Sequence, residues 1–395
     1  MSRPPPRRGL LWLGVVVSLF GSGMSAAATS WFVLERTGST LAVGLLWLVV
    51  TAPGLLIPAL GGVLIDRSDR RLLHAALDAA RGLAVVAAAL AVRRPGLALP
   101  AVYVLMALLG AGWTIGWPNM AALVQERTPP QNLVRANAAY QVAVQAGMMA
   151  AGAAVGFVYA GLGLSGVLLI DAGTYFFSGA CLAALPAVPR EVAPPERRHF
   201  VAEVRAGLTY LRGQRRVMAV GAAWSCMMGG VLSGTVLLVA LASDVLHSGA
   251  RGYGYLEGGW ATGAVLGGLM AGRLARRYPA ALPVAALGVL AFGHGLLPSL
   301  ALVAAAVGAQ ILFGGCRALG GVALQTTLMT TVPNELMGRV QSAFAFLSTV
   351  LQMTMSLLLG WLAQAVSLRV AFLAVGAIYG LGALAAWVAR MEPSP

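Results

Sequence analysis

The chain has 395 residues, of which 59% are hydrophobic and only 10% are charged, and its formal net charge is +14. Because soluble domains carry about 25% charged residues, a soluble fold of this composition would expose large apolar patches and associate. The composition therefore excludes an ordinary soluble domain and predicts an integral membrane protein. Its apolar runs last about 20 residues, the length of a spanning helix, whereas barrel strands alternate over about 10.

We expect an all-α integral membrane protein with twelve transmembrane helices. In chain order, the predicted spans cover residues 10–33, 41–65, 73–93, 97–124, 136–160, 164–187, 216–242, 253–272, 280–301, 304–330, 339–364 and 367–389. The chain contains 50 glycines, many of them inside these spans. Glycine weakens soluble helices, but in a membrane it lets neighbouring helices approach closely.

The placement of arginine predicts the orientation. With the N-terminus inside, the inner loops hold twenty arginines and the outer loops only five, and Arg81 and Arg317 lie within spans. Positive loops face the cytoplasm, so both termini are expected to be cytoplasmic in a multi-pass protein of the plasma (inner) membrane. This loop pattern also favours membrane topology over nucleic-acid binding as the reason for the positive charge.

Two repeats and a polar linker divide the predicted spans into six and six. The loop that begins at Gly62 returns in part at Gly268, 206 residues later, and the run at 109–116 matches 313–320. Residues 188–215 form the longest polar segment. We therefore predict an N-terminal six-helix bundle at 1–187, a cytoplasmic linker at 188–215 and a C-terminal six-helix bundle at 216–395. Internal repeats of this size are typical of transporters.

The loop between spans 2 and 3 carries a recognisable motif. Gly62-x-x-x-Asp66-Arg67-x-x-Arg70-Arg71 resembles the loop signature of the major facilitator superfamily. Leu34-Glu-Arg-Thr-Gly38-Ser39, Asp78-x-x-Arg81 and Pro333-Asn-Glu-Leu-Met-Gly338-Arg339 resemble the branch that contains enterobactin exporters and macrolide-efflux proteins. The resemblance covers essentially the whole chain. It implies two pseudo-symmetric halves that rock about a central site, a mechanism called alternating access.

The resemblance implies a conformational latch on the inner side. Its members would be Gly62, Asp66, Arg67, Arg70, Arg71, Asp78 and Arg81. A carboxylate near a helix N-terminus gains from the helix dipole, and nearby arginines pair with it. The alternative is that the arginines serve only as topology anchors. The second copy of the motif has Gly272 where the first has Asp66, so the acid is the position where we expect a conformational role.

Charges inside a membrane are costly and mark functional hypotheses. Arg317 falls in span 10, which by resemblance lines the central cavity, and we expect it to contact an anionic group; the alternative is a structural ion pair. Glu257 and Asp171 are the other candidates for substrate binding or ion coupling, with helix packing as the alternative for Asp171. Asp78 and Arg81 are three residues apart and so share a helix face, which favours an internal pair.

Polar and aromatic residues in the spans could line a cavity for a large apolar ligand. The candidates are Trp113, Trp117, Asn119, Tyr140 and Gln325. Ordinary helix packing is the alternative for each. No metal-ligand spacing, nucleotide-binding loop or catalytic set is visible; we therefore expect no enzyme activity, no cofactor and no metal.

These features predict a monomeric secondary transporter that exports amphipathic small molecules such as drugs, macrolides or siderophores. Because no nucleotide-binding motif is visible, we expect an ion gradient, that of protons, to drive the substrate across the lipid bilayer. Two alternatives stay open. One is a lysophospholipid flippase or metabolite exporter of the same fold, and the other is a membrane receptor or scaffold that does not transport.

Overall fold

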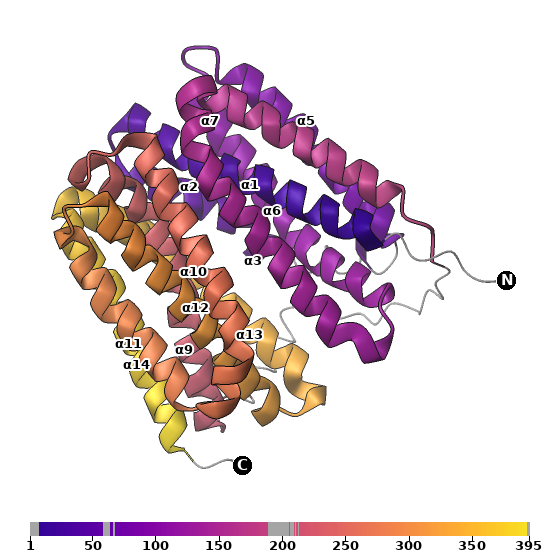
Figure 1. The fold of residues 1–395 in the computed structure, drawn as a ribbon, viewed down its shortest axis with the longest axis vertical. Coiled ribbons are helices and arrows are strands. Elements are labelled where there is room, and N and C mark those ends of the chain that lie inside the picture. The colour runs from indigo at the N-terminus through magenta and orange to yellow at the C-terminus, as the bar shows by residue number, and fades with distance from the viewer. Residues whose placement is uncertain are drawn as a thin grey trace. The chain divides into compact units, whose positions relative to one another are not determined.

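The computed structural model describes residues 8–57, 64–65, 68–188, 205, 209, 211 and 213–392. This part of the chain is helical and contains no strand, which confirms the all-α class. In chain order, the helices are α1 (Arg8–Thr37), α2 (Thr40–Thr51), α3 (Pro53–Leu56), α5 (Arg70–Ala91), α6 (Ala98–Glu126), η1 (Pro130–Asn132), α7 (Leu133–Ala183), α9 (Arg215–Ala240), the π-helical turn η2 (Leu241–Val245), α10 (Gly249–Arg277), α11 (Ala281–Leu296), η3 (Leu297–Ser299), α12 (Val303–Thr331), α13 (Asn334–Ala365) and α14 (Leu368–Met391) (Figure 1).

Nine helices in the described part of the chain are long and apolar enough to cross a membrane. One of them runs through a break: Gly163 has φ 63° and ψ −173°, a left-handed conformation that suits glycine. This break falls between the spans predicted at 136–160 and 164–187. The helix α2 has only 12 residues, and α10 is long but carries several arginines. The fold is therefore consistent with twelve spans, and the exact number stays a prediction.

The chain packs into two compact units. Unit 1 comprises Met1–Phe32 and Ala52–Arg197, and unit 2 comprises Val33–Thr51 and Arg198–Pro395. The segment Val33–Thr51 thus packs with unit 2, because α2 lies against α13 and α9. The predicted halves at 1–187 and 216–395 place this segment in the first bundle, so packing and sequence divide the chain differently at this point. Most of the predicted linker lies outside the described residues.

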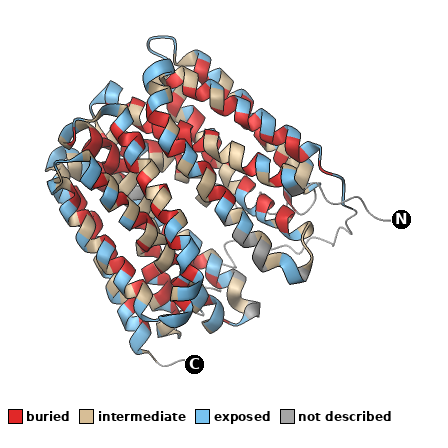
Figure 2. Ribbon diagram, in the orientation of Figure 1, coloured by how far each residue is buried: buried red, intermediate tan, exposed pale blue. Residues whose placement is uncertain are grey.

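Each unit buries its own core. In unit 1, α5 packs along α7 and α6, and in unit 2, α10 packs along α12 while α14 packs along α9 and α11. Buried and exposed residues alternate along the helices of each unit (Figure 2). Many exposed side chains are large and apolar, among them Leu83, Leu269 and Phe292. Side chains of this kind are stable at a surface that lipid covers.

Glycine permits the closest helix contact in unit 2. A Cβ atom at Gly263 of α10 would overlap the carbonyl oxygen of Ile311 on α12, and one at Gly267 would lie 2.5 Å from the carbonyl oxygen of Gly315. Both pairs are 48 residues apart, so the two helices run parallel in a fixed register. Close backbone approach through small residues is the usual way in which membrane helices associate.

Candidate functional site

Three of the predicted latch residues, Gly62, Asp66 and Arg67, lie outside the described residues. Their role between the two halves stays a prediction. The neighbouring Asp69 is described and forms the N-cap of α5, where its carboxylate accepts hydrogen bonds from the backbone N–H groups of Arg71 and Leu72. Partial burial raises the pKa of Asp69, but the hydrogen bond and charge of Arg71 and these two N–H groups outweigh it, so the pKa lies below its ordinary value.

Arg70 and Arg71 tie together helix ends within unit 1. The Nη1 atom of Arg70 lies 3.3 Å from Oε2 of Glu126 and donates to the carbonyl oxygen of Ala122 at 3.1 Å, both on α6. Arg71 binds Asp69 through Nε at 2.9 Å, and its Nη1 donates to the carbonyl oxygen of Leu185, just beyond α7. Arginine near a helix C-terminus satisfies carbonyl groups that the helix leaves free.

Asp78 and Arg81 form the ion pair that their spacing predicts. Nη2 of Arg81 lies 3.3 Å from Oδ1 of Asp78, and the two side chains are 8% and 0% exposed. The guanidinium also lies over the ring of Tyr175 on α7, 5.1 Å from its centroid, and Nε2 of His74 is 4.0 Å from the same carboxylate oxygen. A buried carboxylate of this kind requires its cationic partner.

Asp171 belongs to the same buried region of unit 1. It is fully buried on α7, and the hydroxyl of Thr174 lies 3.3 Å from its Oδ1 atom. One turn on, the hydroxyl of Tyr175 accepts a hydrogen bond from Ser22 on α1 at 2.9 Å. The role of Asp171 in helix packing or in coupling therefore stays a prediction.

The other candidates in unit 1 do not gather at one site. Asn119 is fully buried and donates from Nδ2 to the carbonyl oxygen of Arg70 at 2.9 Å, so it joins α6 to α5. Trp117 is exposed and packs edge-on against Tyr140, with ring centroids 5.7 Å apart. Trp113 is half-buried on α6. The contacts of Asn119 favour helix packing over cavity lining.

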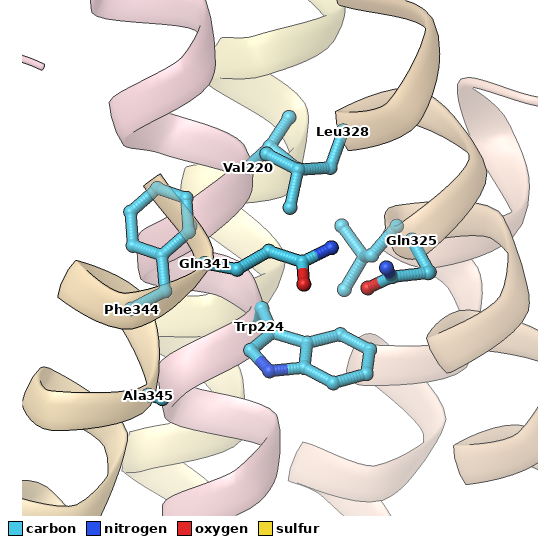
Figure 3. Close-up of a pocket in the computed structure, with 9 residues that line it drawn as sticks. Val220, Trp224, Gln325, Leu328, Gln341, Phe344 and Ala345 are labelled. Atoms are coloured by element: carbon cyan, nitrogen blue, oxygen red, sulfur yellow. The ribbon is translucent and has the colours of Figure 1, made fainter. Parts of the chain in front are cut away.

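In unit 2, Gln325 lines a pocket of about 200 Å³ between α9, α12 and α13. The other walls come from Val220, Gly221, Trp224, Leu324, Leu328, Gln341, Phe344 and Ala345. Figure 3 shows the amide of Gln341 pointing toward Gln325 beside the ring of Trp224. The lining thus combines two aromatic side chains and two uncharged amides with an aliphatic remainder. Among the lining residues that the structure describes, none is acidic or basic.

Arg317 lies on α12, two turns before Gln325, and does not itself line the pocket. A Cβ atom at Gly321 would lie 3.7 Å from Nη1 of Arg317 and 3.9 Å from the Trp224 ring, so the guanidinium and the ring flank the same glycine. Nη2 of Arg317 lies 3.6 Å from the sulfur of Met228. No carboxylate in the described part of the chain forms an ion pair with Arg317.

Glu257 lines a second, smaller cavity in unit 2, with a volume of about 40 Å³. The helix register places Arg317 level with Leu269, twelve residues from Glu257, so the two charges are separated by about 18 Å along the helices. A separation of this size is too long for a direct ion pair. His294 and Gln310 line the same cavity.

Sequence reasoning missed Trp224, Phe344 and Gln341 at the pocket and His294 at the cavity. His294 and Gln341 stand out as polar residues inside or next to apolar runs, which was a usable signal. Trp224 and Phe344 resemble the other aromatic residues of the spans and gave none. No cluster of three or more His, Cys, Asp or Glu side chains that could hold a metal occurs in the residues that the structure describes.

Comparisons with known proteins agree with this architecture. The sequence model of the Major Facilitator Superfamily matches residues 11–354. The chain is 27% identical over 340 residues to the enterobactin exporter EntS of Escherichia coli O6:H1 (strain CFT073), covering 84% of this chain and 79% of EntS.

Solved structures of transporters share the fold. The nucleoside transporter NupG superposes with a TM-score of 0.74 at 15% identity, over 98% of this chain and 99% of NupG. A bacterial homologue of the human lysosomal transporter Spinster, inward-facing and unoccupied, gives a TM-score of 0.73 at 14% identity, over 99% and 98% of the two chains. The all-α architecture, the intramembrane polar residues and the match over most of the sequence lead to one conclusion: the chain is a transporter that belongs to the Major Facilitator Superfamily.

Proposed function

We propose that the protein exports amphipathic aromatic molecules with an anionic group, and that a proton gradient drives this export. The observation that carries the substrate class is the pocket next to Arg317. Trp224 and Phe344 offer apolar surface to a ring, while Gln325 and Gln341 offer hydrogen bonds without charge. Arg317 then supplies a positive charge that has no carboxylate partner among the described residues.

The cost of a charge inside the membrane supports this assignment. An arginine at this depth is stable when it pairs with an anion, because an isolated buried charge is strongly unfavourable. An anionic substrate group would supply the missing partner during each transport cycle. The similarity to the enterobactin exporter at 27% identity supports export as the direction.

The pocket volume sets the size of the group that it can receive. Drug-sized ligands occupy pockets of roughly 300–1,000 Å³, and the volume here is about 200 Å³. This space suits one aromatic group rather than a whole drug-sized molecule. We therefore expect unit 2 to recognise the aromatic end of a larger amphipathic substrate.

A panel of three matched compounds tests the proposal. Naphthoate, naphthamide and naphthylmethylammonium share one ring system and differ in charge. With the purified protein, naphthoate should raise the unfolding temperature most, because a ligand that binds the folded state stabilises it. Counterflow in proteoliposomes then shows whether the bound compound is transported.

Two arginine variants provide the matched comparison. Arg317→Gln should remove the preference for naphthoate over naphthamide, whereas Arg369→Gln, at an exposed arginine on α14, should retain it. Equal binding of all three compounds by the wild type would contradict the assignment of Arg317 to an anion. Binding without counterflow would favour the alternative of a receptor that does not transport.

A further inference from the structure

One face of α10 in unit 2 changes from apolar to basic toward the end of the helix. The exposed residues of this stripe are Leu266, Leu269, Met270, Arg273, Arg276 and Arg277. With 3.6 residues per turn, their side chains fall within a sector of about 120° around the helix axis. Gly263 and Gly267, which meet α12, lie outside this sector. The contact with α12 therefore leaves the stripe uncovered.

The three arginines of the stripe carry charges that no acid balances. None of them forms an ion pair with a carboxylate among the residues that the structure describes. Arg273 lies three residues before Arg276 and four before Arg277, and like charges at this spacing on a helix repel one another. The helix dipole favours the two arginines of the last turn, but Arg273 lies before that turn. An anion bound between the three side chains would remove the repulsion.

Tyr278 extends the basic end of the stripe. It is the C-cap residue of α10, and its side chain is 47% exposed. The guanidinium carbon of Arg277 lies 5.4 Å from the centroid of its ring, so a cation–π contact holds this arginine against the helix end. Guanidinium groups bind phosphate oxygens through two parallel hydrogen bonds, and a tyrosine hydroxyl donates one more. The end of α10 thus offers the donors that a phosphate group requires.

The dimensions of the stripe match the boundary of a bilayer. From Arg273 to Arg277 the helix rises by about 6 Å. The polar headgroup layer on each side of the hydrocarbon core is about 5–7 Å thick. The exposed apolar residues of the stripe precede the arginines directly, at the level where acyl chains begin. One phospholipid can therefore contact both parts of the stripe.

The register between α11 and α14 identifies a second helix end at the same level. A Cβ atom at Gly376 of α14 would lie 2.6 Å from the carbonyl oxygen of Ala291, and one at Gly382 would lie 3.5 Å from a methyl carbon of Leu287. The residue numbers rise on α14 while they fall on α11, so the two helices are antiparallel. Continued by five residues, this register places Trp387 beside the first turn of α11.

The end of α14 has the composition of a membrane–water interface. Trp387 is 46% exposed, and Arg390, about one turn later, is exposed as well. Since α11 begins four residues after the last residue of α10, this tryptophan and arginine lie near the level of the basic end of the stripe. Tryptophan and arginine at one level are typical of the headgroup region. Two helix ends of unit 2 therefore indicate the same interface.

From this arrangement we infer that the basic end of α10 binds the headgroup of an anionic phospholipid, whose acyl chains lie along Leu266, Leu269 and Met270. The inference is independent of the exported substrate. The lipid phosphate accepts hydrogen bonds from the guanidinium groups and supplies the negative charge that they lack. Phosphatidylcholine carries a cationic group that the arginines repel, so the site selects anionic over zwitterionic lipid. Soluble phosphate lacks the contact with the apolar part of the stripe.

Thermal unfolding of the purified protein in mixed micelles tests the site. Dioleoylphosphatidylglycerol, dioleoylphosphatidylcholine and glycerol 3-phosphate are titrated separately. The anionic lipid should raise the unfolding temperature, because it binds the folded state, and the other two should give a smaller shift at the same concentration. One arginine contributes about fivefold to the affinity for an anionic lipid surface. Arg276→Gln and Arg273→Gln should therefore each raise the half-saturating concentration of phosphatidylglycerol about fivefold.

Two further variants provide the controls. Arg369→Gln, at an exposed arginine at the opposite end of α14, should leave the half-saturating concentration unchanged. Arg276→Lys keeps the charge and should bind phosphatidylglycerol more tightly than Arg276→Gln. Equal shifts with the two lipids, or wild-type binding by both Arg276→Gln and Arg273→Gln, would overturn the inference and leave these arginines as topology anchors. A shift with glycerol 3-phosphate as large as that with phosphatidylglycerol would overturn the assignment to a lipid.

Discussion

The buried pair Asp78–Arg81 allows a prediction of stability with a definite magnitude. Replacing Arg81 by Met leaves the fully buried carboxylate of Asp78 without its partner at 3.3 Å. Removing one member of a buried pair costs about 3–5 kcal/mol, because the remaining charge stays desolvated. Arg81→Met also removes the cation–π contact with Tyr175, which is worth about 0.5–2 kcal/mol. We therefore expect the free energy of unfolding to fall by roughly 3.5–7 kcal/mol.

A double-mutant cycle isolates the pair itself. Asp78→Asn with Arg81→Met removes both charges, so the double variant should be about 2–3 kcal/mol more stable than the sum of the single effects predicts. The assay is equilibrium unfolding in mixed detergent micelles. Arg94→Met, at an exposed arginine in the loop after α5, should change stability by less than about 0.5 kcal/mol. Additive single effects, or a fully stable Arg81→Met variant, would refute the reasoning.

Three further predictions concern the packing of α10 against α12, the N-cap of α5 and the predicted latch. Gly263→Ala should destabilise unit 2, because its methyl group would overlap the carbonyl oxygen of Ile311. Gly268→Ala, whose methyl group would meet no atom within 4 Å, should be neutral or stabilising by up to about 1 kcal/mol. Thermal unfolding compares the two variants, and equal effects would contradict the close contact. Asp69→Ala should cost about 1 kcal/mol as a lost N-cap. Since the pKa of Asp69 lies below its ordinary value, its contribution is complete above about pH 4 and is lost on acidification through the lowered pKa, so unfolding curves of wild type and Asp69→Ala should converge in acid. Asp66→Asn should abolish transport in proteoliposomes while the protein stays folded and inserted, and unchanged counterflow would eliminate the latch.

The sequence was most informative where one local pattern determines the structure. Long apolar runs predict membrane helices because a bilayer requires every backbone polar group to be satisfied within the helix. The spacing of Asp78 and Arg81 predicts their contact because residues three apart share a helix face. The break at Gly163 falls between two predicted spans because glycine readily adopts the left-handed backbone conformation that ends a helix.

The candidate site depends on contacts between distant segments, and the sequence predicted less of it. Trp224 and Phe344 are more than a hundred residues apart, and only the packing of α9 against α13 makes them neighbours. Asn119 looked like a cavity residue because it is polar in an apolar run, yet its amide is bound to the backbone of Arg70. A polar residue inside a span marks an unusual environment, and the fold decides whether that environment is a cavity or a helix contact.

One measurement tests the central claim, proton-driven export of an aromatic anion, most directly. Naphthoate uptake into inside-out proteoliposomes, which corresponds to export from the cell, is followed while the lumen is made more acidic than the medium. The account predicts accumulation against the naphthoate gradient, its collapse when an ionophore dissipates the pH difference, and its loss in Arg317→Gln but not in Arg369→Gln. Accumulation that is indifferent to the pH difference, or equal in both arginine variants, would contradict it.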